Sequence, residues 1–596
     1  MNHSGPGDGV AVVIVGFATN RQLPVPELVI LSAAIDPGRQ DPGGRNMIRI
    51  AKVATTLLGV ALAAGMFTLA ASSQSKDTFV FAAEGDPVLI DGAFVSDGPS
   101  LRITYQIFEG LVRLKPGTGK VEPALAQSWS SSKNGLAWTF KLRKGVKFTD
   151  GTPLNARAVC FNFNRQYTLP AHLQGEGVNY YWYTVFGGYA KPGAGNPGPD
   201  KSLYRGCKAV NDSTARLFIT RRSTSFLGGL ALSNFGIASP TALVKYKADE
   251  ATVGADGVLR PTGTFATKNP IGTGPYKLQS WTIGDRLVLI RNDNYWGPKA
   301  KMRRVIVRPI ADNTARLQAL QTGEVDGINL VQPQDIPTIK NNRNLKVLDR
   351  PAFNIGYVGL NQKKGPLAKL KVRQAIAYGL DRKSVVGAFY GGRGTLANQF
   401  LPPGLEGYAK SGVPAYPFNP AKAQQLLREA GESLPVSLEF WYPTDRPRGY
   451  MPDPPRNFQA FAASLERSGF KVTAHPAPWR GGYVAGLQGG DAQIYLFGWT
   501  GDFVDPANFL NVHFGSESAQ FGFKNQALFA LLQKADGETD LEKRSVLYQQ
   551  ASVMVMKFLP MVPYANNKPA LGFKKSVQGY VTSPVELESF ATVYFK

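Results

Sequence analysis

Short apolar runs separated by polar turns recur along the chain and are typical of β-strands. Residues 78–82 read Thr-Phe-Val-Phe-Ala, and residues 304–308 read Arg-Val-Ile-Val-Arg, so each run predicts a strand. From Trp138 to Leu142, apolar and polar residues alternate, and the alternation continues through Val146 and Phe148. We therefore expect strand structure to continue beyond residue 142.

Helical spacing of apolar residues alternates with such strands in the second half of the chain. It predicts helices over residues 313–321, 370–380, 420–430 and 457–469. The third begins with an Asn419 cap and Pro420 and ends before Gly431, which are standard helix boundaries. Further strands are predicted at 325–330, 436–440 and 471–474, and long loops at 187–203 and 250–270. This alternation predicts an α/β or α+β class.

The chain has 596 residues and a net charge of +24. A core rarely grows beyond about 300 residues, so two or three lobes are expected. The first 71 residues carry five basic and four acidic side chains, so the excess lies in the remainder. Its basic residues are scattered, which predicts a solvated basic surface and no nucleic-acid partner.

Residues 47–73 have the layout of a secretory signal peptide. Arg49 and Lys52 precede nineteen uncharged residues, 53–71, and small residues follow. A retained membrane anchor is the alternative, because nineteen residues can just span a bilayer. Residues 1–46 are interpreted as an extension from a misassigned start codon or as a disordered segment. The protein is therefore predicted to be exported, periplasmic or extracellular, or tethered by an uncleaved signal.

Cysteine and histidine are scarce. Cys160 and Cys207 are the two cysteines, and export favours a disulfide between them over two separate buried thiols. The four histidines show no metal-ligand spacing, so His513 is interpreted as structural; the alternative, a contribution to a nickel or haem site, depends on the family resemblance described below. No motif of a hydrolase, metalloprotease or nucleotide-binding loop is present. We predict no catalytic residues, no metal and no cofactor.

Eight short motifs occur in a fixed order. They are Phe108-Glu109-Gly110-Leu111-Val112, Pro123-Ala124-Leu125-Ala126, residues 142–151, Ile271-Gly272-Thr273-Gly274-Pro275-Tyr276, Gly323-Glu324-Val325-Asp326, Val372-Arg373-Gln374-Ala375-Ile376, Gly498-Trp499-Thr500-Gly501-Asp502 and Asp505-Pro506-Ala507-Asn508-Phe509. Together they resemble the family 5 extracellular solute-binding proteins, which serve ABC importers of peptides, nickel and opines. The resemblance covers about residues 78–596 and is nearest in motif to the dipeptide-binding branch.

The resemblance implies a periplasmic-binding-protein-like fold of type II in its large three-domain form. Two lobes would close on a central ligand cleft. Domain I would comprise residues 77–112, 265–348 and 572–596. Domain II would be an insertion at 113–264 that holds the disulfide, and domain III would be 349–571.

Ligand residues carry over from the same branch. Asp502 matches the acid that holds a peptide's ammonium group, with Trp499 and Gly501 beside it. Arg448 with Tyr450 is the preferred partner for the peptide carboxylate, and Arg446 is the second choice, because the Arg-Pro-Tyr-x-Pro pattern is altered here. A structural role, as turn residue or exposed loop arginine, is the alternative for each.

Aromatic residues complete the predicted site. Trp441, Trp479, Tyr483 and Trp499 are expected either to line the cleft or to belong to the core. The predicted function is capture of short peptides for an ABC permease by a monomer. The same scaffold binding a nickel chelate, haem, an opine or an oligosaccharide is the first alternative, and a secreted adhesion protein is the second.

Overall fold

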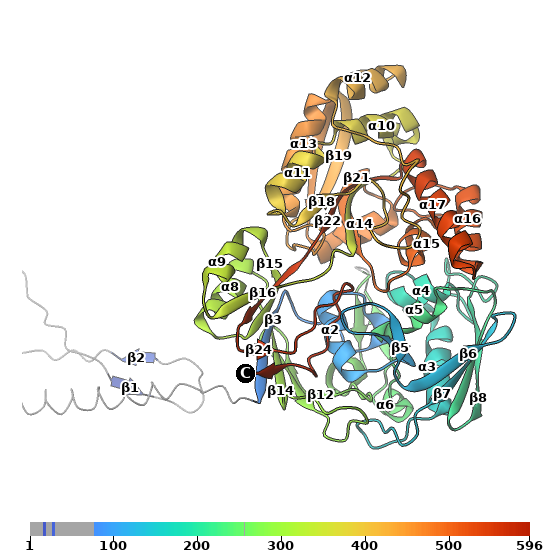
Figure 1. The fold of residues 1–596 in the computed structure, drawn as a ribbon, viewed down its shortest axis with the longest axis vertical. Coiled ribbons are helices and arrows are strands. Elements are labelled where there is room, and N and C mark those ends of the chain that lie inside the picture. Colours follow the sequence, from blue (N-terminus) through green and yellow to red (C-terminus); the bar gives the residue numbers. More distant parts are fainter. Residues whose placement is uncertain (1–15, 19–26, 30–76, 255–256) are drawn as a thin grey trace, which may run out of the picture. The chain divides into compact units, whose positions relative to one another are not determined.

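The computed structural model describes residues 16–18, 27–29, 77–254 and 257–596. The chain divides into two units, residues 1–73 and 74–596. In the first unit, β1 (Gly16–Ala18) pairs antiparallel with β2 (Glu27–Val29). The predicted signal peptide, 47–73, lies outside the described residues, as does most of the predicted extension. The rest of the fold belongs to the second unit (Figure 1).

A seven-stranded mixed sheet is assembled from distant parts of the chain. Its order is β12 (Tyr276–Thr282), β13 (Arg286–Arg291), β14 (Arg304–Pro309), β3 (Thr78–Ala83), β15 (Gly327–Val331), β23 (Ala570–Lys574) and β16 (Leu345–Asp349). The strands β14, β3 and β15 run parallel, and the other neighbours are antiparallel. Helices α8 (Asn313–Thr322) and α9 (Ile336–Asn341) lie beside β15 and β16 (Figure 1).

A six-stranded sheet forms the second large layer. Its order is β18 (Gly394–Leu396), β22 (Met561–Asn567), β17 (Asn354–Leu360), β21 (Ile494–Thr500), β19 (Val436–Pro443) and β20 (Phe470–Ala477). Around it lie α10 (Leu370–Gly379), α11 (Arg382–Phe389), α12 (Pro420–Glu429), α13 (Pro454–Arg467), α14 (Val484–Gly489), α15 (Leu510–Phe514), α16 (Gln526–Gly537) and α17 (Leu541–Phe558). Two short connections, 350–353 and 568–569, join this sheet to the seven-stranded one.

A four-stranded antiparallel sheet forms the third layer. Its order is β6 (Ala126–Ser131), β7 (Ala137–Leu142), β9 (Thr214–Ile219) and β8 (Tyr204–Asn211). Three two-stranded ribbons are β4–β5 (Val112–Leu114, Val121–Pro123), β10–β11 (Ala251–Val253, Leu259–Pro261) and β24–β25 (Val577–Gln578, Tyr594–Phe595). The remaining α-helices described are α2 (Gly98–Ile107), α3 (Ala156–Tyr167), α4 (Tyr180–Phe186), α5 (Phe226–Leu230), α6 (Pro240–Lys245) and α7 (Phe265–Lys268).

Most predicted elements are present, and two predictions are wrong. The helix predicted at 420–430 is α12, and the Asn419 side chain accepts a hydrogen bond from the Lys422 N–H as its cap. The predicted strand beyond 142 is absent, because Gly145 takes a positive φ of 76° and turns the chain. The predicted loop at 250–270 contains β10, β11 and α7.

The predicted disulfide is confirmed. It joins Cys160 of α3 to Cys207 of β8, whose Cα atoms are 5.2 Å apart. The bond fastens α3 to one face of the four-stranded sheet. The boundaries of the three predicted domains stay a prediction.

A half-buried carboxylate joins two of the sequence motifs. Glu109, just after α2, accepts hydrogen bonds from the hydroxyls of Tyr295 (2.7 Å) and Thr273 (2.8 Å) and from the indole N–H of Trp296 (2.7 Å). Gly272 approaches so closely that a Cβ there would lie 2.1 Å from the Ile107 carbonyl oxygen. Burial raises the pKa of Glu109, and the three donors partly oppose this shift.

We predict that Glu109→Gln destabilises the protein. The amide would present its NH₂ group to donors that need an acceptor, so buried donors would lose their partners. The free energy of unfolding should fall by about 2 kcal/mol, measured by denaturant titration. Glu466→Gln, at an exposed position, is the control and should change it by less than about 0.5 kcal/mol. Equal effects of the two substitutions would show that the three donors do not stabilise the fold.

Candidate functional site

The site is built on strand β21 and the loop that follows it. Phe497 and Trp499 are two residues apart on β21, so their rings project from the same face of the sheet. The ring of Trp479 stacks on Phe497 with centroids 5.3 Å apart and planes 5° from parallel. The guanidinium of Arg448 lies over Trp479, 3.7 Å from its ring centre. We call Trp479, Phe497 and Trp499 the aromatic strip, and Arg448 lies at its Trp479 end.

Asp502 lies at the other end of the strip. The hydroxyl of Tyr181 donates to Asp502 Oδ1 at 2.7 Å, and the amide of Asn508 donates to Oδ2 at 3.3 Å. Asn508 Oδ1 in turn accepts from the Asp502 backbone N–H (2.7 Å) and from the Trp499 indole (3.3 Å). Asn508 therefore fixes Trp499 and Asp502 relative to each other.

The loop that carries Asp502 is held by a separate ion pair. Asp505 caps the short helix η7 (Pro506–Asn508). Its Oδ1 and Oδ2 atoms both accept hydrogen bonds from the guanidinium of Arg544 of α17, at 2.8 and 2.7 Å. A Cβ at Gly501 would lie 2.1 Å from the Phe353 ring. The predicted ligand residue Gly501 thus packs against Phe353, and its small size is needed for that packing.

Asp502 has no cationic partner. Among the described residues it forms no ion pair, and its hydrogen-bond donors are neutral. The pKa of Asp502 is raised to about 6, because burial raises it more than the hydrogen bonds from Tyr181 and Asn508 lower it. A half-buried carboxylate in this state can accept a cation without first losing another.

Arg448 is the basic counterpart of Asp502. It is half-buried, forms no ion pair within the described residues, and its Nε has no hydrogen-bond partner. Burial lowers its pKa. Arg446 differs, because its Nε lies 3.7 Å from Asp445 Oδ2 and its guanidinium faces Gly85 of the loop after β3. Arg448 is therefore the freer of the two predicted candidates.

The other predicted aromatic residues have packing contacts. Tyr450 is buried, and its ring fills the space that a side chain at Gly498 would occupy. Trp441 stacks on His475 of the neighbouring strand with ring centres 3.7 Å apart. Tyr483 is fully buried and donates its hydroxyl proton to the Leu496 carbonyl. No described contact joins any of the three to Asp502.

Sequence reasoning missed the contacts of Tyr181 and Asn508 with Asp502, and it did not place His513 beside Trp499. Tyr181, on α4, contacts Asp502 from 321 positions away. Asn508 belongs to a recognised motif, but nothing in that motif assigns it to Asp502. His513 lies against Trp499 with ring centres 4.8 Å apart, and burial lowers its pKa to about 4. Its neutral ring is part of the aromatic surface.

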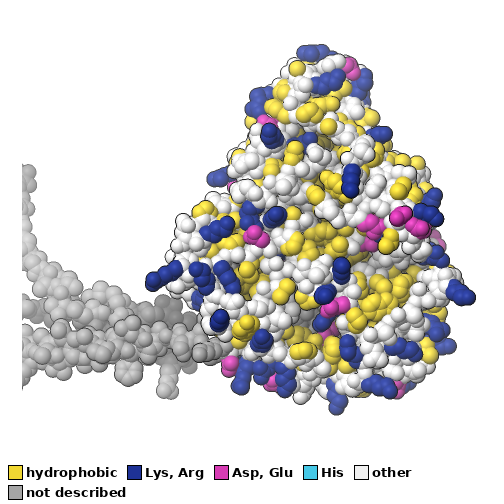
Figure 2. Space-filling view, in the orientation of Figure 1, with side chains coloured by type: hydrophobic (Ala, Val, Ile, Leu, Met, Phe, Trp, Pro, Cys, Tyr) yellow, Lys and Arg dark blue, Asp and Glu magenta, His cyan; other side chains and the backbone are white. Residues whose placement is uncertain are grey.

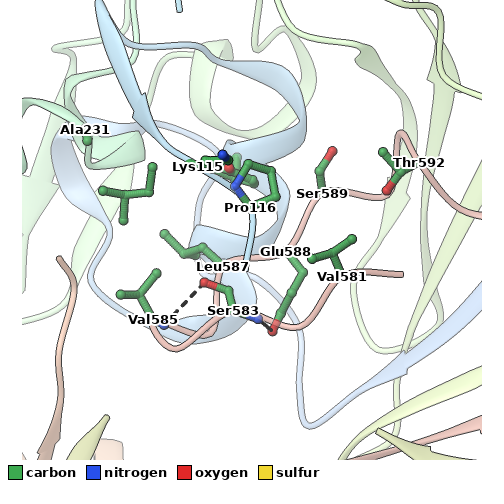
Figure 3. Close-up of a pocket in the computed structure, with 12 residues that line it drawn as sticks. Lys115, Pro116, Ala231, Val581, Ser583, Val585, Leu587, Glu588, Ser589 and Thr592 are labelled. Carbon is green, nitrogen blue, oxygen red and sulfur yellow. Dashed lines mark hydrogen bonds between the residues drawn. The ribbon is translucent and has the colours of Figure 1, made fainter. Parts of the chain in front are cut away.

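Two small cavities lie outside the strip. One, of about 20 Å³, is bordered by Arg448, Gly449 and Pro452 on one side and by residues 330–333 and 567–570 on the other. The second, of about 30 Å³, lies between Lys115–Pro116 and the segment 581–592 (Figure 3). Each has room for about one water molecule. The second contains none of the predicted ligand residues.

The described residues hold neither a cluster of metal ligands nor a helix able to span a membrane. No group of His, Cys, Asp and Glu in that part of the chain is arranged to hold a metal ion. No helix described there has the length and apolar character needed to cross a membrane.

Comparison with known proteins identifies a family. The model of bacterial extracellular solute-binding proteins, family 5 (middle region), matches residues 120–521. The dipeptide-binding protein of Escherichia coli K12 is 31% identical over 563 residues, covering 92% of this chain and 99% of that protein. Heme-binding protein A of Haemophilus influenzae is 32% identical over 537 residues, covering 87% and 92%.

Solved structures confirm the predicted fold class. The periplasmic binding protein DppA of Helicobacter pylori, in complex with the peptide STSA, has a TM-score of 0.75 and 28% identity, covering 87% of this chain and 98% of that one. The dipeptide-binding protein of Pseudoalteromonas sp. SM9913, in complex with Met-Leu, has a TM-score of 0.75 and 25% identity, covering 87% and 100%. The predicted type II periplasmic-binding-protein fold is therefore present.

We predict that Tyr181→Phe raises the pKa of Asp502 further above about 6. The substitution removes a hydrogen bond that favours the ionised carboxylate and keeps the ring. Carbon-13 NMR of labelled aspartate during a pH titration measures the shift. Tyr180→Phe is the control, because the Tyr180 ring contacts Trp499 and its hydroxyl makes no hydrogen bond to Asp502. An unchanged Asp502 titration in Tyr181→Phe would contradict the assigned bond.

Proposed function

Because the chain belongs to family 5 of the bacterial extracellular solute-binding proteins, we propose that it captures short peptides outside the cytoplasmic membrane and delivers them to an ABC importer. Relatives named as dipeptide-binding proteins and structures with bound peptides support this ligand class. The protein would act as an exported monomer that the membrane subunits of the importer recognise in its closed form.

One observation carries the choice of ligand. Asp502 and Arg448 are half-buried charges, each without an ion partner among the described residues, and the aromatic strip joins them. A peptide has an ammonium group at one end and a carboxylate at the other. Burying it requires a partner for each charge, since an unpaired buried charge opposes binding strongly.

We assign a role to each group. Asp502 would accept the peptide ammonium, with Tyr181 and Asn508 holding its carboxylate in place. Arg448 would offer its planar guanidinium to the peptide carboxylate, while Trp479 supports the guanidinium from one face. Phe497 and Trp499 would contact the peptide between the two charges.

The position of Tyr181 supports a mechanism in which two lobes close on the ligand. It comes from α4, whereas Asp502 and Arg448 belong to the loops around the six-stranded sheet. Movement of α4 away from that sheet would break the Tyr181–Asp502 hydrogen bond and expose the carboxylate. Ligand binding would then favour the closed arrangement, in which both lobes contact the peptide.

Peptide binding is favoured over the alternatives. Heme-binding protein A is among the relatives, so a tetrapyrrole is a relevant competitor. A nickel chelate or an oligosaccharide would not need a carboxylate and a guanidinium at separate ends of an aromatic strip. An opine, as an amino-acid conjugate, carries an amine and a carboxylate too, so the two charges do not separate it from a peptide; the relatives named as dipeptide-binding proteins favour the peptide.

We predict that Asp502→Asn weakens binding of the dipeptide Met-Leu by roughly 30-fold to several thousand-fold, measured by calorimetry at pH 7.5 (about 2–5 kcal/mol). Since the pKa of free Asp502 is about 6, wild-type affinity should fall as the pH drops below 6 and the carboxylate becomes protonated. The variant should show no such loss. Asp491→Asn, at an exposed position, is the control and should bind like the wild type. Unchanged affinity in Asp502→Asn would exclude Asp502 from the site.

The carboxylate partner is tested with a modified ligand. Wild-type protein should bind Met-Leu at least tenfold more tightly than Met-Leu amide, because the amide has no charge for the guanidinium. We predict that Arg448→Gln abolishes this preference and that Arg446→Gln keeps it. The reverse result would assign the role to Arg446. A preference retained by both variants would remove this segment from carboxylate binding.

A further inference from the structure

The topology of the seven-stranded sheet gathers distant strand ends along one edge. In the pairing of β14 with β3, Arg304 lies opposite Thr78, so both strands begin at this edge. In the pairing of β16 with β23, Leu345 lies opposite Lys574, and the Lys575 N–H donates to the Asn344 carbonyl at 2.7 Å. Because β15 is parallel to β3 and antiparallel to β23, these four strand ends share that edge.

Basic side chains cluster along it. The residues at or just before these strand ends include exposed lysines and arginines from three separate parts of the sequence, namely Lys299, Lys301, Arg303, Arg304, Arg343 and Lys575. We call them the basic edge. Figure 2 shows Lys and Arg side chains, with some Asp and Glu among them, over the region that Figure 1 labels β14 and β24.

The acidic residues of this edge are already paired. Asp293 accepts from Arg291 at 2.7 Å, and Asp326 accepts from Lys574 at 2.8 Å. Glu324 pairs with Arg308, and Asp77 lies 3.6 Å from Arg303.

The positive excess that remains lies on five side chains. Lys299, Lys301, Arg304, Arg343 and Lys575 form no ion pair within the described part of the chain. Of these, Lys301 lies over the Tyr594 ring, with its Nζ 4.0 Å from the ring centre, so the other four are the ones to replace in a test. The edge therefore carries an uncompensated positive charge that faces solvent.

The chain enters the second unit at this same edge. The Arg304 N–H donates to the Asp77 carbonyl at 3.0 Å, so residue 77 lies among the basic side chains. The uncharged segment 53–71, long enough to reach across a bilayer, ends six residues before it. Six residues span at most about 20 Å. In a chain that retains residues 53–71 as a membrane anchor, this short stretch of sequence is the covalent connection between the anchor and the basic edge.

We propose that the basic edge binds an anionic phospholipid surface. Anionic headgroups attract basic residues near the membrane, and the attraction decays over a Debye length of about 8–10 Å. The short connection limits residue 77 to at most about two such lengths from the end of a retained anchor. Binding would orient the protein with the start of β3 toward the membrane, independently of any peptide ligand.

Vesicle binding of the full chain tests the proposal. Affinity is measured by sedimentation for vesicles of phosphatidylcholine alone and of equal parts phosphatidylcholine and phosphatidylglycerol. The neutral vesicles report the apolar segment, so the difference reports charge. Replacing Lys299, Arg304, Arg343 and Lys575 by Gln should reduce the preference for anionic vesicles by a factor on the order of several hundred, at about fivefold per charge. Added salt should reduce the wild-type preference.

A matched variant separates position from net charge. Replacing Lys133, Lys144, Lys208 and Lys383 by Gln removes the same charge at exposed positions elsewhere, and it should keep most of the preference. Equal losses in the two variants, or no wild-type preference for anionic vesicles, would overturn the proposal. So would an edge variant that loses binding to soluble dextran sulfate while keeping its vesicle affinity. If the quadruple variant does not fold, two double variants, with Gln at Lys299 and Arg304 or at Arg343 and Lys575, replace it, and each should reduce the preference by about 25-fold.

Discussion

The free energy of burying charge determines how this protein is organised. A carboxylate that leaves water needs a cation or several donors, and a guanidinium needs an acceptor. Asp502 has two neutral donors, Tyr181 and Asn508, and no cation within the described residues. Its pKa near 6 reflects that deficit, because burial opposes its ionised form more than the donors favour it. An incoming ammonium group would supply the missing charge.

Structural ion pairs elsewhere in the fold contrast with Asp502, which has no cation beside it among the described residues. Arg350, at the crossing between the two large sheets, is fully buried and makes a bidentate pair with Glu588 at 2.7 and 2.9 Å. Arg165 pairs with Asp91, and Arg544 pairs with Asp505. Each of these arginines has an acid in place, and the buried Arg373 and Arg382 donate to backbone carbonyl oxygens instead. The scaffold therefore supplies an acceptor to each of these buried guanidinium groups, whereas Arg448 Nε has none and Asp502 has no cation within the described residues, which fits a ligand role better than a packing role.

The sequence predicts those parts of the fold that depend on neighbours along the chain. Periodicity and capping locate β3, α8 and α12, because strand alternation and an Asn419 cap are local properties. The resemblance locates Asp502. Neither reveals Tyr181, since a hydrogen bond across 321 positions leaves no local pattern. The alternation beyond residue 142 was misleading because Gly145 turns the chain where side-chain pattern alone predicts continuation.

The same limit applies to charge. Along the sequence the basic residues are scattered, and from that scatter a uniformly solvated surface is the natural expectation. Folding brings Lys299, Arg304, Arg343 and Lys575 to one edge because parallel and antiparallel pairing align strand ends that are far apart in sequence. Two kinds of electrostatics then coexist. Asp502 and Arg448 are half-buried, so salt would screen the proposed contacts with a small zwitterion only weakly, while it would screen the proposed contacts of the exposed edge with an anionic surface strongly. Ionic strength should therefore separate the two activities, since it acts on the edge far more than on the strip.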